Sequence, residues 1–329
     1  MEQKSVLIGM SGGVDSSVAA ALLKEQGYHV IGATMRLWTY SDSCNMKHEG
    51  CCAESAVEDA RRVCDKLGID FYVMNFKDMF KDKVVDYFVD EYIHGRTPNP
   101  CIACNKYLKF DALLKKALAM GIDYVATGHY AKIEKGEDGK YILRASEAVK
   151  KDQSYVLYNF TQEQLAHTLM PLGGYNKDWV RQKAEELGLG VAHKPDSQEI
   201  CFVEDDDYAK FITDYSGYKP KEGDILDVNG NVIGKHRGLI YYTIGQRKGI
   251  GAYGRPMFVM KIDAENNTIT LGEKGMEFSN ELTAYDVNFV SGEFPKENML
   301  ITAKVRYQAP PAAAMLCPQK DGTGKLMFP

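Results

Sequence analysis

Ser11-Gly-Gly-Val-Asp-Ser16 is the most informative motif in the chain for predicting its fold. A short apolar run, Val6–Met10, precedes it, and an apolar segment with helical spacing follows it as far as about Gln26. Glycines between a strand and a helix permit positive φ and close backbone approach, so successive N–H groups and the helix N-terminus can face one anion. The Lys of a Walker A loop is missing. The stretch therefore predicts a phosphate-binding turn unlike that of kinases or GTPases; the alternative is a plain glycine turn.

Strands and helices alternate through the first two thirds of the chain. The apolar patterns predict strands over residues 6–10, 29–35, 71–74 and 123–127. They predict helices from just after Ser16 to about 26 and over 54–67, 77–94 and 110–120. Such alternation is typical of an α/β fold with a doubly wound, mostly parallel sheet, which binds ligands at the carboxyl ends of its strands. After residue 208, glycine-rich and β-rich runs occur at 256–262, 268–271 and 300–305. We expect an α/β domain over 1–208 and two small β-rich domains over 209–275 and 276–329.

Composition and charge narrow the class of protein. The chain has 329 residues, of which 45% are hydrophobic and 26% charged, as in ordinary globular proteins. No apolar run reaches the length of a membrane span, and the N-terminus does not resemble a signal peptide, so we expect a cytoplasmic protein without membrane partners. The net charge is −5, divided into −7 for residues 1–208 and +2 for the rest. Neither part is basic, so any nucleic acid must be bound by local patches.

Cysteine spacing suggests chemistry at two places. Thr97-Pro-Asn-Pro-Cys-Ile-Ala-Cys104 precedes a segment with a helical apolar stripe, and a helix N-terminus favours a thiolate at Cys104. The alternative is a pair of buried structural cysteines. Cys201 is a single cysteine in a polar loop, and such a cysteine is more often structural than catalytic. Zinc could also be bound by Cys44, His48, Cys51 and Cys52, although we favour a structural or partner-facing loop without a metal there.

Six motifs together resemble one family. In chain order they are SGGVDS (11–16), GRTPNPCIACNKYLKF (95–110), ATGHYA (126–131), KDQSYVL (151–157), KPDSQEICF (194–202) and YTIGQRKGIG (242–251). This set resembles the bacterial tRNA-specific 2-thiouridylases, which are PP-loop ATP-pyrophosphatases, and the resemblance covers essentially the whole chain. Members usually extend further at the C-terminus. The resemblance therefore implies a PP-loop domain, a central domain and a C-terminal β-barrel that is incomplete here.

The family resemblance implies a reaction and its partners. Such an enzyme uses ATP and Mg²⁺ to adenylate the oxygen at position 2 of the wobble uridine, and a cysteine persulfide then replaces that oxygen with sulfur. The implied partners are tRNAs for lysine, glutamate and glutamine, and a sulfur-relay protein or cysteine desulfurase. Two rivals stay open, namely a PP-loop tRNA-modifying ligase that uses an amine, and a non-enzymatic nucleotide- or RNA-binding module.

The resemblance also assigns residues. Cys201 is the expected persulfide carrier, and Cys104 is the expected nucleophile, able to form a disulfide with it. The implied ATP site is Gly9, Met10, Ser11, Gly12, Gly13, Val14, Asp15, Ser16, Met35 and Gly128. The target base is expected at Asn99, Pro100 and Cys101, and tRNA at His129, Lys151, Asp152, Gln153, Tyr307 and Gln308. Arg247 and Lys248, in a glycine-rich loop, are candidates for phosphate contacts, with a solvated turn as the alternative.

One position departs from the family pattern. Many members have Asp where this chain has Cys101. Cys101, Cys104 and Cys201 could instead hold three irons of a 4Fe–4S cluster, or could join a zinc site. We favour the persulfide mechanism without a metal at these cysteines, and keep the iron–sulfur enzyme as the alternative.

Overall fold

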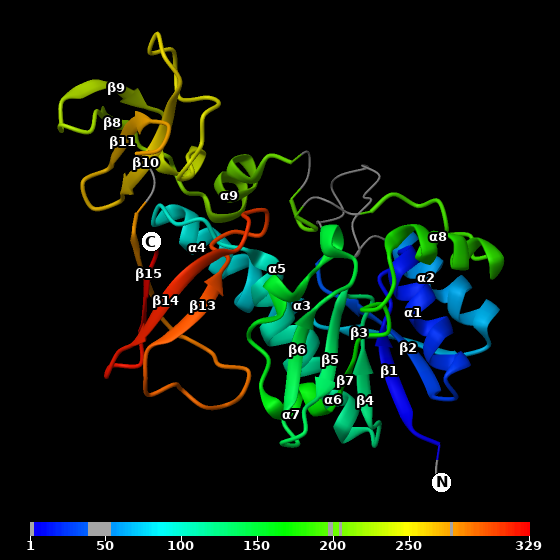
Figure 1. Ribbon diagram of the computed structural model, residues 1–329. Coiled ribbons are helices and arrows are strands. Elements are labelled where there is room, and N and C mark those ends of the chain that lie inside the picture. The colour runs from blue at the N-terminus through cyan, green and yellow to red at the C-terminus, as the bar shows by residue number, and fades with distance from the viewer. Residues whose placement is uncertain (1–2, 39–53, 197–199, 204–205, 277–278) are drawn as a thin grey trace.

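A computed structural model describes residues 3–38, 54–196, 200–203, 206–276 and 279–329 (Figure 1). Its centre is a five-stranded sheet of order β3-β2-β1-β4-β7, in which every neighbouring pair is parallel. The strands are β1 Ser5–Gly9, β2 His29–Arg36, β3 Asp70–Asn75, β4 Tyr124–Ala126 and β7 Thr168–Leu169. The predicted parallel α/β fold is confirmed, since helices occur in the connection from β1 to β2 and in that from β3 to β4.

Helices cover both faces of this sheet. Leu7 of β1 belongs to one hydrophobic cluster, while its neighbours Val6 and Ile8 belong to another, and all three are fully buried. Because side chains alternate across a strand, the two clusters lie on opposite faces.

The α-helices are α1 Val14–Glu25, α2 Glu54–Leu67, α3 Lys77–Phe80, α4 Tyr87–Ile93, α5 Pro100–Ala103, α6 Leu113–Ala119, α7 Gln162–Ala166, α8 Lys177–Glu186 and α9 Tyr208–Ser216. Two π-helical segments, η1 Lys81–Asp86 and η2 Cys104–Ala112, and three 3₁₀ turns, η3 Val149–Lys151, η4 Ser154–Leu157 and η5 Leu239–Tyr241, complete the set.

Two local expectations need correction. The helix expected over 110–120 begins ten residues earlier, at Pro100, and continues through η2 into α6. The Asn99 side chain caps it by accepting a 3.0 Å hydrogen bond from the Cys101 amide, and proline at the first helical position is favourable. An antiparallel hairpin of β5 Ala131–Lys135 and β6 Tyr141–Ala145 follows β4 and was not expected. The helix expected over 77–94 is present as α3, η1 and α4.

The last third of the chain is β-rich, as predicted. One four-stranded sheet has the order β10-β11-β8-β9, and a second has the order β12-β15-β14-β13. Their strands are β8 Gly223–Leu226, β9 Val232–His236, β10 Met257–Asp263, β11 Thr268–Glu273, β12 Glu281–Ala284, β13 Met299–Ala303, β14 Ala312–Pro318 and β15 Gly324–Met327. The exact domain boundaries stay a prediction.

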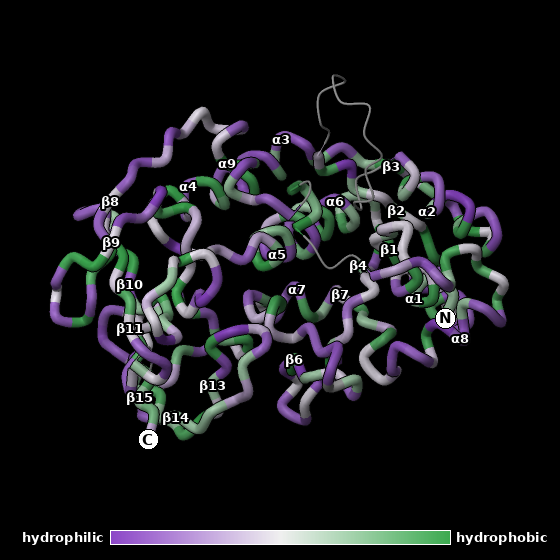
Figure 2. Tube along the Cα trace, turned by 90° about the horizontal axis from the view of Figure 1, so that it is seen from above, coloured by the Kyte–Doolittle hydropathy of each residue, from purple (hydrophilic) through white to green (hydrophobic). Residues whose placement is uncertain are grey.

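Both β-rich sheets rest against the α/β part. The two views agree that α4 and α5 lie between the parallel sheet and the β-rich sheets (Figures 1 and 2). The Asn288 side chain donates to the carbonyl of Tyr158 at 2.7 Å, and the hydroxyls of Thr97 and Thr243 lie 3.4 Å apart. Arg306 donates to the carbonyl of Ile244 at 3.0 Å and so links the two β-rich parts to each other. In the part of the chain described, no helix is long and apolar enough to cross a membrane.

Candidate functional site

The phosphate-binding turn lies at the carboxyl edge of the parallel sheet. β1 ends at Gly9 and α1 begins at Val14, so the turn joins a buried strand directly to a helix N-terminus. Gly12 has φ +69°, and a Cβ built on it would lie 2.3 Å from the carbonyl oxygen of Ala56. Only glycine fits there. Inside the turn, the Ser11 amide donates to the Ser16 hydroxyl at 3.2 Å. The turn is therefore fixed at the edge where doubly wound folds bind ligands, and its binding of an anion stays a prediction.

Segments from two neighbouring strands adjoin this turn. The Met10 amide donates to the carbonyl of Ala33 on β2 at 2.8 Å, which places the carboxyl end of β2, with Met35, beside the turn. Gly128, just after β4, lies so close that a Cβ there would be 2.7 Å from the Ser16 nitrogen. The structure thus brings together the residues that we expected to bind ATP, and their binding of ATP stays a prediction.

Asp15 has two partners inside the protein. The hydroxyl of Tyr130 donates to its carboxylate at 2.7 Å, and the ammonium of Lys177 lies 2.8 Å from both carboxylate oxygens. Burial, and then the neighbouring Asp15 charge, raise the pKa of Tyr130, so this hydroxyl stays protonated and remains a donor. The sequence analysis missed Lys177 and Tyr130, because both are far from Asp15 in the chain.

The carboxylate of Asp15 fits a magnesium ion bound together with ATP. Mg²⁺ is commonly held by one or two carboxylates plus substrate phosphates, and Asp15 lies at the turn that would hold those phosphates. Its oxygens are now paired with Lys177. Binding of Mg²⁺ at Asp15 would therefore exchange one cation for another at the same carboxylate.

The two cysteines with expected catalytic roles belong to one hydrophobic cluster. Cys104 is 8% exposed and is a member of the cluster that includes Phe88 and Phe202, and Cys201 is partly buried against the same cluster. Cys201 carries a free thiol, so the implied disulfide is not formed in this structure. Cys101 is exposed, three residues before Cys104 on the same helix. Both cysteines thus contact the same hydrophobic cluster, and Cys201 is the more accessible of the two.

The described residues contain no group of three His, Cys, Asp or Glu side chains placed to hold a metal ion. The three cysteines Cys101, Cys104 and Cys201 therefore do not fit an iron–sulfur cluster or a zinc ion in this arrangement. The other suggested zinc ligands, Cys44, His48, Cys51 and Cys52, lie outside the described residues.

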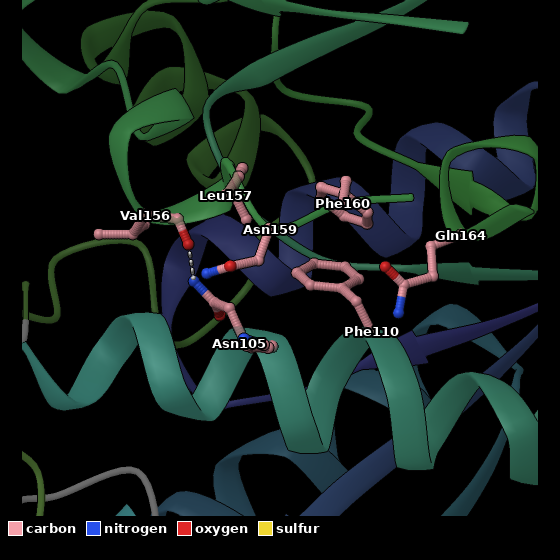
Figure 3. A pocket seen from close by; sticks show the side chains of 8 residues that line it. Asn105, Phe110, Val156, Leu157, Asn159, Phe160 and Gln164 are labelled. Atoms are coloured by element: carbon pink, nitrogen blue, oxygen red, sulfur yellow. Dashed lines mark hydrogen bonds between the residues drawn. The ribbon is translucent and has the colours of Figure 1, made fainter. Parts of the chain in front are cut away.

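The helix that carries Cys104 widens at that residue. Cys104 is the first residue of the π-helical segment η2, and π-helical turns are frequent at functional sites. The next residue, Asn105, donates to the carbonyl of Val156 at 3.1 Å and lines a cavity of about 10 Å³ with Phe110 and Phe160 (Figure 3). This cavity holds at most about one water molecule. It is too small for a nucleotide, and the Asn105 contact instead pins the helix to the segment around η4.

Some residues expected to contact tRNA have partners within the protein. His129 is 9% exposed, its Nδ1 lies 2.7 Å from the Thr127 hydroxyl, and burial holds its pKa well below the usual range, with a further lowering from Lys109. Gln153 exchanges two hydrogen bonds with the backbone of Tyr130. These contacts hold both side chains in place, and the tRNA contacts expected of His129 and Gln153 stay predictions.

Asp152 and Lys151 also have partners within the protein. The carboxylate of Asp152 accepts hydrogen bonds from Ser146 and Ser154, and Lys151 pairs with Asp196 at 2.8 Å. The tRNA contacts of these residues stay predictions.

Other candidate tRNA residues are open to solvent. Tyr307 is 39% exposed, its ring lies 6.0 Å from that of Tyr155, and the ammonium of Lys304 lies 5.2 Å from its centre. Exposed rings beside cations are suited to stacking with bases. Exposed positions also include Gln308, Arg247 and Lys248. Accessibility agrees with a nucleic-acid surface here, and the contacts themselves are untested.

Comparisons with known proteins find family models for residues 4–205 and 209–273 and relatives that match the whole chain. A family model described as tRNA methyl transferase HUP domain matches residues 4–205, and one described as tRNA methyl transferase PRC-barrel domain matches residues 209–273. A protein of Acetivibrio thermocellus named tRNA-specific 2-thiouridylase MnmA is 57% identical over 100% of this chain and 92% of its own length. A protein of the same name from Clostridioides difficile is 58% identical over 99% of this chain and 90% of its own length.

Similarity to solved structures is distant. A 4-thiouridine synthetase in complex with RNA and ATP aligns with a TM-score of 0.38 at 18% identity, covering 58% of this chain and 43% of that one. NMN synthetase from Francisella tularensis aligns with a TM-score of 0.37 at 17% identity, covering 67% and 79%.

Proposed function

Because the chain belongs to the tRNA-specific 2-thiouridylase family, we propose that it adenylates a wobble uridine of tRNA with ATP and then inserts sulfur from a persulfide on Cys201. The enzyme is a tRNA-uridine 2-sulfurtransferase. One observation carries the proposed mechanism: an anion-binding turn at the sheet edge and two cysteines, Cys104 and Cys201, in one hydrophobic cluster occur in the same α/β unit. Activation of the base by ATP requires the turn, and transfer of sulfur requires the two thiols.

The first step activates the base. Oxygen 2 of the uridine attacks the α-phosphorus of ATP, an O–P bond forms, pyrophosphate leaves, and the ring nitrogen at position 3 loses its proton. The turn from Gly9 to Ser16 holds the phosphates. Asp15 would hold Mg²⁺, and that ion would supply positive charge beside the phosphates. A carbonyl oxygen is a poor leaving group, and adenylation converts it into AMP.

The second step transfers sulfur. The terminal sulfur of the Cys201 persulfide attacks carbon 2 of the base and displaces AMP. The Cys104 thiolate then attacks the Cys201 sulfur, a Cys104–Cys201 disulfide forms, and the thiolated base leaves and regains its proton. The two thiols thereby supply the two electrons that reduce the transferred sulfur. A thiol reductant must afterwards restore both cysteines, and a persulfide donor must reload Cys201.

The surroundings of the cysteines suit these unequal roles. Cys201 is partly exposed, as a residue that receives sulfur from a donor protein must be. Cys104 lies in the early turns of a helix that begins at Pro100, where the helix dipole favours the thiolate. The target base is proposed to lie at Asn99, Pro100 and Cys101, at the start of that helix.

The partners are proposed on the family relationship. We expect tRNAs for lysine, glutamate and glutamine as substrates, and a sulfur-relay protein or cysteine desulfurase as donor. Methyl transfer, the activity in the description of the matching family models, has no support in the site, because a turn shaped for phosphates serves ATP. An amine-transferring ligase would have no use for the pair Cys104 and Cys201.

Pyrophosphate release in the presence and absence of tRNA tests the proposed function. We expect tRNA-dependent release by the wild-type protein and a loss of about 100-fold or more in Asp15→Ala, since a preorganised charge at the reacting phosphates is removed. Asp65→Ala, which removes an exposed carboxylate on α2, is the matched control and should keep full activity. Near-wild-type release by a folded Asp15→Ala protein would contradict the assignment.

A further inference from the structure

The phosphate-binding turn has no cation of its own. Residues 9–16 contain neither Lys nor Arg, whereas a Walker A turn carries a lysine that reaches the β- and γ-phosphates of its nucleotide. These two phosphates carry most of the negative charge of ATP, and in the proposed reaction they leave as pyrophosphate. The amide groups of the turn offer only partial charges to them. A cation from elsewhere in the fold would complete such a site.

Helix α8 brings a lysine to the turn. Lys177 is the first residue of α8, and Val180 and Ala184 of this helix belong to the same hydrophobic cluster as Val14 of α1. Residues three and seven positions apart lie on one face of a helix, so the packing of α8 against α1 also fixes Lys177. Its side chain is only 12% exposed, and its ammonium lies 2.8 Å from both carboxylate oxygens of Asp15.

Lys177 belongs to an ion-pair cluster with more cations than carboxylates. Besides Asp15, its ammonium contacts a carboxylate oxygen of Asp196 at 2.7 Å. Asp196 is also paired with Lys151 at 2.8 Å and with Arg181 at 3.3 Å. Three cations thus share two carboxylates, and this cluster adjoins the turn through Asp15. Its excess of positive charge favours an anion beside the turn.

Both carboxylates keep a partner when Lys177 turns away from them. Asp196 retains Lys151 and Arg181, and Asp15 retains the 2.7 Å hydrogen bond from the hydroxyl of Tyr130. The ammonium of a lysine ends a flexible stem and binds phosphate as a point charge. A turn of Lys177 toward a phosphate therefore avoids the penalty of leaving a partly buried carboxylate unpaired.

We propose that Lys177 binds the β- and γ-phosphates of ATP, in place of the lysine that the turn lacks. The inference rests on the proposed function and adds to its ATP site a residue that contacts the substrate. When the bond to the α-phosphorus breaks, the ammonium offsets the negative charge that develops on the departing pyrophosphate. Lys177 thus acts in the adenylation step, and the sulfur-transfer step does not use it.

Ligands that differ in their phosphates test this assignment. A non-hydrolysable ATP analogue, inorganic pyrophosphate and AMP are titrated by calorimetry into the full chain at saturating Mg²⁺. We expect Lys177→Met to weaken binding of the analogue and of pyrophosphate about tenfold or more, as the loss of one charge-assisted hydrogen bond allows. Binding of AMP should stay unchanged, because AMP has only the α-phosphate. Equal losses for the analogue and for AMP would overturn the assignment, since they would give Lys177 a structural role alone.

A second background separates a direct contact from an effect through Asp15, because Lys177→Met also removes a partner of that carboxylate. In Asp15→Asn the side chain has no charge to neutralise, so a lysine that acted only through Asp15 would have no further effect there. We expect Lys177→Met to weaken binding of the analogue by a similar factor in the Asp15→Asn background. An unchanged affinity in that background would overturn the direct contact.

A matched control lies on the same helix. Lys183 of α8 pairs with Glu25 at 2.9 Å, so Lys183→Met should bind all three ligands as the wild type does. Lys177→Gln keeps hydrogen-bond donors for both carboxylates but has no charge, and it should show the same losses if Lys177→Met does not fold.

The wild-type titrations distinguish this inference from the proposed function. If the wild type binds the analogue and the folded Lys177 variants bind it equally well, the phosphate contact is wrong and the ATP site stands. If the wild type binds neither the analogue nor pyrophosphate, both the ATP site and the contact are wrong.

Discussion

Cys104 and Cys201 share one hydrophobic cluster but differ in exposure, and this difference separates their roles. A thiol that receives sulfur from another protein must be reached from outside, whereas a thiol that resolves the product needs only to reach its partner. Cys201, which is partly exposed, meets the first requirement, and the more buried Cys104 is proposed for the second role.

Serine substitutions at these two positions should block different steps. Cys201→Ser is expected to adenylate tRNA but to accept no sulfur. Cys104→Ser should accept labelled sulfur on Cys201 and stall before product release, because no thiolate attacks the Cys201 sulfur. Sulfur label on the protein and AMP release measure the two steps. Cys317→Ser, far along the chain in β14, is the control. Sulfur accepted by Cys201→Ser would remove Cys201 from its assigned role.

Cys101 distinguishes the persulfide mechanism from an iron–sulfur mechanism. It is exposed, and its amide rather than its thiol takes part in the helix cap with Asn99. We expect Cys101→Ser and Cys101→Asp to keep substantial thiolation activity, with the aspartate at least equal to the serine. A brown wild-type protein that absorbs near ~400 nm, together with inactive variants at Cys101, would support a cluster instead.

At the scale of elements, the phosphate-binding turn depends on one close approach. Gly12 and Gly27 both have positive φ, but only at Gly12 would a Cβ meet another backbone atom, 2.3 Å from the oxygen of Ala56. Gly27→Ala should cost about 1 to 2 kcal/mol from the left-handed conformation alone. Gly12→Ala adds a clash that must displace α2 or the turn.

The paired alanine variants therefore test the turn. We expect Gly12→Ala to lose ATP binding and to be less stable than Gly27→Ala in denaturant unfolding, whereas Gly27→Ala should bind ATP normally. Equal ATP affinity in the two variants would show that the turn does not need its close contact with α2.

The sequence predicted those elements that local signals specify. The strand, glycine turn and helix at residues 5–25 follow from an apolar run and two glycines, and the helix over 77–94 from its apolar spacing. The start at Pro100 was missed although Asn99 and Pro100 form an ordinary cap. The hairpin β5–β6 was missed as well, despite the turn signal Asp138-Gly139. The pairing of Asp15 with Lys177 could not be predicted, because 162 residues separate the partners and only the fold brings them together.

At the scale of the whole molecule, an acidic chain must bind an acidic substrate. The net charge of −5 gives no general attraction to tRNA, so affinity must come from local cations. Arg247 and Lys248 are exposed between β9 and β10, whereas Lys151 is paired with Asp196. The exposed pair should therefore contribute more to binding than Lys151.

The dependence of tRNA affinity on salt measures that contribution. Arg247→Ala should weaken binding for all tRNAs and lower the slope of log affinity against log salt by about 0.7 to 0.9. Lys151→Ala should change the slope less. Lys235→Ala is the control, since Lys235 is already paired with Asp224 in the same β-rich sheet. An unchanged slope in Arg247→Ala would exclude this loop from the tRNA surface.

The central claim is that one active site uses ATP and a Cys201 persulfide to thiolate a tRNA uridine. Its most direct test is nucleoside mass spectrometry of tRNA from cells that lack their own 2-thiouridylase, after incubation with the protein and an isotopically labelled persulfide donor. We expect labelled 2-thiouridine at the wobble position with wild-type protein and ATP, and none when ATP is omitted or when Cys201→Ser replaces the wild type. Labelled 2-thiouridine formed without ATP or by Cys201→Ser, or a methylated nucleoside in its place, would contradict it.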